Sequence, residues 1–206
     1  MALEVWFSFF VVTVITVVSP GPAVLLAVTH GAQFGARRAV FPVLGNVTGL
    51  AIIITASAVG IGSILQASSE AFFWLRIVGG LYLIFLGVKL LRSSSQIMTM
   101  DVQPKSRTRT YLQGITLALS NPKALLFIGA LFPHFIDVSN PALPQFMVMG
   151  ATMMTISFCS LMTYAMLSNS LIEKGKASLI GKANKVTGAL FVLFGLALAR
   201  EAVKDF

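Results

Sequence analysis

Six long apolar runs are the feature that most constrains the fold of this 206-residue chain. An α-helix needs about 20 apolar residues to cross the hydrocarbon core of a bilayer. The runs lie near residues 5–28, 39–65, 71–92, 111–135, 144–168 and 184–200. Because backbone amides and carbonyls find no water inside a membrane, such runs must be helical. The sequence therefore predicts an all-α integral membrane protein with six transmembrane helices.

The composition excludes a soluble protein. Hydrophobic residues make up 56% of the chain and charged residues only 11%, with a mean hydropathy of +0.87. A soluble domain carries about 25% charged residues. The longest gap between runs, residues 93–110, is short and polar. We therefore expect one transmembrane domain over residues 1–206, with a first repeat at 1–92, a cytoplasmic loop at 93–110 and a second repeat at 111–206.

The cations occupy alternate gaps between the apolar runs. The first, third and fifth gaps hold Arg37, Arg38, Arg92, Lys105, Arg107, Arg109, Lys174, Lys176, Lys182 and Lys185. The second and fourth gaps hold Glu70 and Asp137 and no cation. By the positive-inside rule, the basic gaps are cytoplasmic and both termini lie outside. The net charge of +8 thus reflects membrane anchoring, and we expect no nucleic-acid partner.

The two halves of the chain resemble each other. Ser-Pro-Gly-Pro at residues 19–22 and Ser-Asn-Pro-Lys at residues 120–123 place helix breakers inside spans 1 and 4, and an apolar helix then resumes. Val78-x-Gly80 with Gly87 is echoed by Val186-x-Gly188 with Gly195 in span 6. Since each half has three spans, the second half enters the membrane from the opposite side. This predicts two inverted repeats, a plan common among secondary transporters.

The two broken helices are the predicted substrate site. Proline removes a backbone donor, so freed carbonyls need other partners in hydrocarbon. Pro22 and Pro122 fit the first position of a new helix, where Ser19, Ser120 or Asn121 can cap the free amides. The positive ends of the two half-helices suit a carboxylate. The candidate substrate-binding residues are Ser19, Pro20, Gly21, Pro22, Asn46, Asn121, Pro122 and Lys123.

Lys123 is the charge nearest to the middle of a span. Such a charge costs about 2.5–3.5 kcal/mol on insertion scales, so a functional role is the first hypothesis. The alternative is a lysine that snorkels to the interface or pairs with a carbonyl. In span 2, Gly45 and Gly49 are four residues apart and predict close helix contact, with Asn46 as a polar group between them. Ser157, Ser160, Thr163 and Tyr164 form a polar stripe in span 5, which either joins helices or lines a path.

These motifs resemble the LysE/RhtB family of amino-acid exporters. The resemblance rests on Ser19-Pro20-Gly21-Pro22, the segment Gly31 to Arg38, Gly45-x-x-x-Gly49, Asn121-Pro122-Lys123 and Leu131-Phe132-Pro133-x-Phe135. It covers essentially the whole chain and is stronger for the homoserine/threonine branch than for the lysine branch. It implies an exporter in the bacterial cytoplasmic membrane, driven by the proton motive force. Some relatives carry an acid near the position of Ser157, and this chain does not.

The remaining ionisable residues limit the mechanism. No Asp or Glu lies in the middle of a span, which favours zwitterionic over dicationic substrates. Asp137 and His134, near the outer end of span 4, are the candidates for proton coupling. His30 and His134 lie near the ends of different spans and Cys159 is the single cysteine, so we expect no metal site, no cofactor and no enzymatic activity. An exporter of another small solute or cation, or a channel, is the alternative function, and a homo-oligomer is compatible with the sequence.

The predicted topology can be tested by labelling. A cysteine placed at Ser106 or Ser178 should react with a membrane-impermeant maleimide only from the cytoplasmic side, because both positions lie in basic gaps. The measurement is labelling of intact cells compared with inverted vesicles. Labelling of either position from outside would contradict this topology.

Overall fold

Helices make up nearly all of the described part of the chain. The computed structural model describes residues 1–67, 69–92, 106–137, 139–169, 185–186, 188–197 and 200. The elements are α1 (Leu3–Val18), α2 (Pro22–Phe34), α3 (Ala36–Ala67), α4 (Ser69–Arg92), α5 (Arg107–Ser120), α6 (Pro122–Leu126), the π-helix η1 (Phe127–Leu131), the 3-10 helix η2 (Phe132–Phe135) and α7 (Ala142–Met166). A short apolar helix follows at Gly188–Ala197. No strand occurs within these residues, which agrees with the predicted all-α fold.

The helices have the length and composition of membrane spans. Residues 36–60 of α3 and the whole of α7 can each cross a bilayer alone. The pair α1 and α2, bent by 55°, and the pair formed by α5 and residues 122–135, bent by 56°, each qualify as one broken span. Up to four crossings are thus accounted for, and the breaks predicted in spans 1 and 4 are confirmed. The six-span topology stays a prediction, because Gly80–Lys89 and Gly188–Ala197 are shorter apolar helices.

The second half of broken span 4 differs from the expected regular helix. After five residues of α6, the chain continues as the π-helix η1 and the 3-10 helix η2. Pro133 has no amide hydrogen, so the α-helical hydrogen-bond ladder cannot run through this segment. Single turns of π-helix commonly occur next to functional sites, where they change the direction of side chains. An apolar helix therefore resumes after the break, as expected, but most of residues 122–135 are π- or 3-10-helical.

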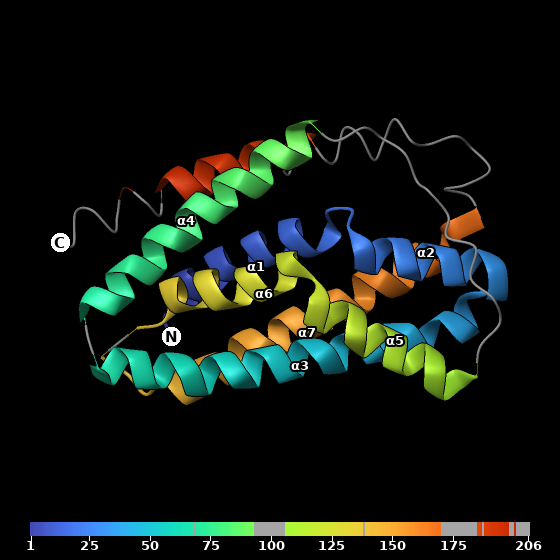
Figure 1. The fold of residues 1–206 in the computed structure, drawn as a ribbon, viewed down its shortest axis with the longest axis horizontal. Coiled ribbons are helices and arrows are strands. Elements are labelled where there is room, and N and C mark those ends of the chain that lie inside the picture. The colour runs from blue at the N-terminus through green and yellow to red at the C-terminus, as the bar shows by residue number, and fades with distance from the viewer. Residues whose placement is uncertain are drawn as a thin grey trace.

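The helices α3 and α5 run side by side in close contact (Figure 1). Gly45 faces the backbone carbonyl of Tyr111, and Gly114 faces the carbonyl of Pro42. A Cβ atom at either glycine would overlap these oxygens, so only glycine permits this separation. The Tyr111 hydroxyl also donates to Thr48 Oγ1 at 2.9 Å. The close contact predicted from Gly45 and Gly49 is confirmed, and α5 is the partner helix.

A second close pair joins α4 to the helix Gly188–Ala197, along one side of the molecule (Figure 1). Gly80 packs on Gly195, and Gly87 packs on Gly188, through direct contact with the backbone. In the sequence echo, Gly80 corresponds to Gly188 and Gly87 to Gly195. Gly80 therefore contacts the residue that corresponds to Gly87, and Gly87 contacts the residue that corresponds to Gly80. A two-fold axis between the two helices produces this pattern.

An aromatic core packs the start of α1 against the end of span 4. Phe9 stacks edge-on against Phe132 and Phe135, with ring centroids 5.2 and 5.3 Å apart. Phe127 and Phe146 complete this group, and all five rings are buried. The N-terminal end of α1 and η2, at the C-terminal end of span 4, are thereby held at the same end of the molecule.

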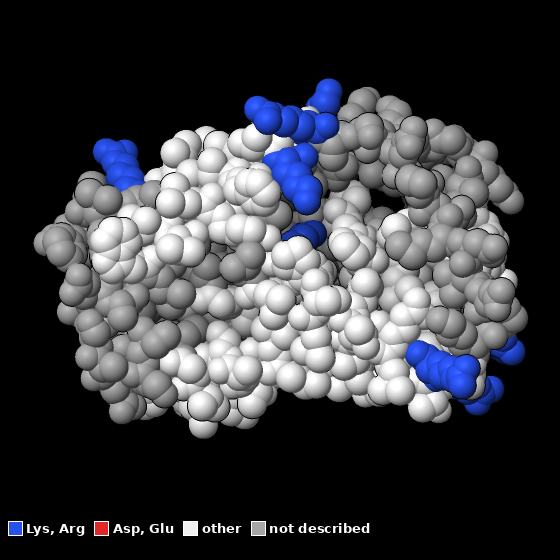
Figure 2. Space-filling model, in the orientation of Figure 1, with Lys and Arg blue, Asp and Glu red and all other residues white. Residues whose placement is uncertain are grey.

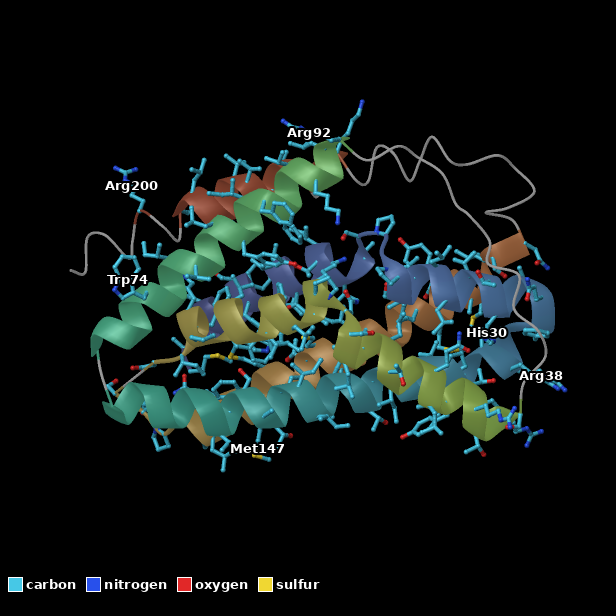
Figure 3. The ribbon with its side chains drawn as sticks, viewed as in Figure 1. His30, Arg38, Trp74, Arg92, Met147 and Arg200 are labelled. Carbon is cyan, nitrogen blue, oxygen red and sulfur yellow. The ribbon has the colours of Figure 1, made fainter. Side chains whose placement is uncertain are left out.

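The described cations lie at three places. Figure 2 shows Lys and Arg over the end of α4, where α3 and α5 begin, and at the opposite end of the molecule, where Figure 3 labels Arg200; no acid is visible on the described part of this face. Arg38 marks the second place, whereas Arg92 lies much nearer the middle of the long axis (Figure 3). Lys105, Lys174, Lys176 and Lys182 fall outside the described residues. The orientation of the termini stays a prediction.

The glycine contact between α3 and α5 predicts a specific destabilisation. Gly114→Ala should lower the stability of the protein by roughly 1–3 kcal/mol, because its Cβ meets the rigid backbone of Pro42. Gly60→Ala is the matched control, since a Cβ there meets nothing within 4 Å. The measurement is the melting temperature of both variants in detergent. Equal melting temperatures would show that the helices separate at no cost.

Candidate functional site

The two helix breaks meet through one side chain. The Lys123 ammonium donates to the backbone carbonyl of Ser19 at 2.9 Å and also to Ser19 Oγ, across 104 positions of the sequence. Gly21 lies beside the same side chain, with its Cβ direction 3.9 Å from Lys123 Cδ and Nζ. The structure therefore brings the two breaks together, as the sequence predicts. The sequence left two alternatives to a functional role for Lys123, which were snorkelling to the interface and pairing with a carbonyl. The structure shows pairing with a carbonyl.

A cavity of about 50 Å³ lies at this meeting point. Five of the eight predicted residues line it, namely Ser19, Gly21, Asn46, Asn121 and Lys123. Thr16 and Ser157 add polar groups, and the apolar part of the wall is formed by Val17, Ala23, Val24, Leu50, Ala124, Phe127, Met153 and Leu161. A cavity of this size holds a few waters or a small polar group.

The polar wall of the cavity consists of neutral oxygens and amides around one cation. Asn46 Nδ2 lies 3.4 Å from Ser157 Oγ, and both side chains are buried. Thr16 Oγ1 donates to the carbonyl of Val12 at 2.7 Å and keeps its lone pairs for another donor. Among the described residues no carboxylate lines the cavity, and Lys123 is the one that brings a formal charge to it.

The three prolines shape the breaks and do not line the cavity. Pro22 and Pro122 occupy the first positions of α2 and α6, as expected, and both are exposed. Pro20 is half-buried. Their contribution to the site is therefore to end one helix and begin the next, because each lacks the amide hydrogen that a continuous helix needs.

The capping of the two half-helices differs. Asn121 Oδ1 accepts from the Lys123 amide at 3.1 Å and so caps α6. Of the alternatives Ser19, Ser120 and Asn121, Asn121 is thus confirmed for α6, and Ser120 Oγ instead donates to Thr116 O. Ser19 does not cap α2, which begins after Gly21 with no side-chain cap, and its Oγ accepts from Lys123. The positive end of α2 therefore has free amides for an anion.

Residues of the polar stripe in span 5 both line the cavity and join helices, which are the two roles that the sequence left open. Ser157 lines the cavity, and the Tyr164 hydroxyl donates to the carbonyl of Val18 at 2.8 Å. That carbonyl lies at the end of α1, where the break removes its helical partner. Tyr164 thus supports the break from α7. Thr16 was missed by sequence reasoning, because a threonine inside an apolar run gives no local signal of a cavity.

The two candidates for proton coupling lie away from this cavity. Asp137 is exposed in the loop after η2, and His134 packs on Phe135 with ring centroids 5.4 Å apart. Hydrogen bonds from Ser139, then from Asn140, hold the pKa of the Asp137 carboxyl below its ordinary value. Their role in coupling stays a prediction. Within the described residues, no group of three or more His, Cys, Asp or Glu is placed to hold a metal ion.

Apolar helices with two breaks around a polar cavity place this chain among the polytopic membrane proteins. A family profile described as "LysE type translocator" matches residues 14–202, and the chain belongs to this family. No solved structure matches the chain.

Three relatives that match this chain over nearly all of their length narrow the class of membrane protein. A homoserine/homoserine lactone efflux protein of Salmonella typhimurium is 35% identical over 98% of this chain and 100% of its own length. An uncharacterized membrane protein of Vibrio cholerae is 29% identical, covering 97% of this chain and 98% of itself. A leucine efflux protein of Klebsiella pneumoniae is 28% identical over 94% of both chains. The family and these relatives support an amino-acid exporter.

The environment of Asp137 predicts how it affects transport. A carboxyl with a lowered pKa stays ionised from about pH 5 to about pH 8, so it takes up no proton there. Asp137→Asn should therefore leave the shape of the pH profile of export unchanged. The measurement is the initial efflux rate at a series of pH values. A profile flattened by this substitution would assign the coupling proton to Asp137.

Proposed function

We propose that this protein exports small, neutral amino acids of the homoserine/threonine type from the bacterial cytoplasm, driven by protons. The observation that supports this most directly is the cavity between the two breaks. Among the described residues it offers the amino group of Lys123, several neutral oxygens and no carboxylate. A neutral amino acid is a zwitterion whose carboxylate and ammonium find N–H donors and oxygen acceptors in such a wall, whereas the second ammonium of a lysine-like dication finds no carboxylate there.

The two ends of a zwitterion find different partners. The carboxylate suits the uncapped, positive start of α2 at Gly21, beside the N–H donors of Lys123. The ammonium suits oxygen acceptors, which Ser19, Asn46 and Ser157 present in the same cavity. The substrate-binding set is therefore Ser19, Gly21, Asn46, Asn121 and Lys123 with Thr16 and Ser157, and the three prolines hold the breaks open.

The internal symmetry of the chain supports alternating access. Two breaks with similar sequences meet at one cavity, and the glycines of α4 contact the counterparts of their neighbours. Two inverted halves of three spans can exchange conformations around such a central site. Six spans, outward termini and the cytoplasmic membrane of a bacterium belong to this proposal.

An efflux experiment tests the proposal. Cells that produce the protein are preloaded with homoserine, threonine, leucine or lysine, and efflux is followed against cells without it. We expect faster efflux of the neutral amino acids than of lysine, against their gradients, and its loss when an uncoupler removes the proton gradient. Efflux that only follows the gradient would indicate a channel, and no difference between the cells would refute the proposal.

The charge at the cavity should be needed for uphill export. Lys123→Met keeps most of the stem and removes the ammonium, so uphill export should fall by about tenfold or more while the protein still reaches the membrane. Lys123→Arg should rescue poorly, because a planar guanidinium differs from a compact ammonium in shape and hydration. The measurement is efflux normalised to membrane abundance. A methionine variant with the normal rate would make Lys123 purely structural.

A further inference from the structure

The Lys123 ammonium occupies acceptor atoms that a substrate ammonium would also use. It donates to Ser19 O at 2.9 Å and to Ser19 Oγ, within the wall of the central cavity. We infer that Lys123 is a tethered competitor of the substrate's α-ammonium for the Ser19 oxygens, so that substrate binds as Lys123 gives up its proton. Lys123 is then the proton carrier of the exporter. This inference rests on the proposed function.

The acceptor site is created by the first break. The carbonyls at the end of α1 have no partner within the helix, because the next helix starts only at Pro22. Carbonyls freed at broken membrane helices, at the negative end of the helix dipole, attract cations. In the structure Lys123 satisfies the Ser19 carbonyl, and Tyr164 satisfies that of Val18. The Ser19 carbonyl therefore requires a hydrogen-bond donor, from the protein or from the substrate.

Two ammonium groups do not fit this place together. The ε-ammonium of lysine and the α-ammonium of an amino acid are both compact groups with three donors, so they compete for the same oxygens. The cavity measures about 50 Å³, and no carboxylate of the described residues lines it, so two ammonium groups at the Ser19 oxygens would repel each other. The two allowed states are an ammonium on Lys123 without substrate, and a neutral Lys123 amine with substrate.

The proton balance of this exchange is one to one. When substrate binds, one Nζ–H bond of Lys123 breaks, the electron pair stays on Nζ and the proton passes to cavity water. When substrate leaves, Nζ takes up one proton and returns to Ser19. Protons and amino acids therefore cross the membrane in opposite directions, as proton-driven export requires.

The surroundings leave Lys123 as the titrating group of the cavity. No other ionisable side chain of the described residues lines it. The described ionisable groups on the elements packed around it are Glu4 on α1, Cys159 and Tyr164 on α7, Tyr82, Lys89 and Arg92 on α4, Arg37 and Arg38 on α3, His30 on α2, Arg107, Arg109 and Tyr111 on α5, and His134 on η2. Glu4 and Cys159 are exposed and do not line the cavity. Phenols and guanidinium groups ordinarily titrate well above neutral pH. His30 lines a different cavity, between α2 and the starts of α3 and α5.

The test measures the Kd of the purified full-length protein for homoserine from about pH 5.5 to about pH 8.5. If binding releases one proton, this Kd changes by about tenfold per pH unit. For the wild type, Kd should rise as the pH falls, and calorimetry in two buffers of different ionisation heat should show one proton released per homoserine. For Lys123→Met, Kd should change by less than about twofold, with no proton released. Lys89→Met, an exposed lysine of α4, is the control and should keep the wild-type slope.

Three results would overturn the inference. If the Kd of the wild type for homoserine does not change with pH and no proton is released, the proposed exchange of proton and substrate is refuted. This result needs no variant. A folded Lys123→Met protein that binds nothing at any pH would show that Lys123 holds the carboxylate. If the Kd of Lys89→Met does not change with pH, the group that releases the proton is Lys89 on α4 and not Lys123. If the wild type binds and exports no amino acid at all, the proposed function itself fails.

Discussion

The structure depends on how it satisfies backbone groups that two helix breaks expose inside an apolar bundle. In hydrocarbon an unpaired carbonyl costs several kcal/mol, because no water can replace the lost partner. The chain meets this demand with side chains from distant helices, since Lys123 and Tyr164 donate to the carbonyls of Ser19 and Val18. The bonds that satisfy the breaks also position the polar groups of the cavity. Stability and the candidate site therefore rest on the same contacts.

Glycine contacts give these breaks a rigid frame. Gly45 and Gly114 let α3 and α5 approach until backbone touches backbone, and Gly87 and Gly188 do the same for α4 and the last described helix. Dispersion and close packing, rather than the hydrophobic effect, hold helices together in lipid. Two tightly joined helix pairs next to two broken helices suit a transporter, in which rigid parts must move around a central site.

The cavity wall has a polar part and an apolar part. The polar part comes largely from the breaks themselves, with Ser19, Asn121 and Lys123, and the apolar part includes Leu50, Phe127 and Met153. In the proposed function the polar part holds the charged groups of the substrate and the apolar part contacts its side chain. The relatives named as a homoserine/homoserine lactone efflux protein and a leucine efflux protein are 35% and 28% identical to this chain over 100% and 94% of their own lengths.

The sequence by itself determined the all-α membrane fold, the two breaks and the close glycine contact of α3, because these follow from rules that act within a few residues. A proline ends its own helix, and about 20 apolar residues span a bilayer wherever they occur. Only the tertiary structure decided that Lys123 binds Ser19, that Thr16 and Ser157 share its cavity, and that residues 127–135 leave the α-helix. The first two outcomes join residues 104 and 141 positions apart, and helix packing rather than local chemistry selects which polar groups meet.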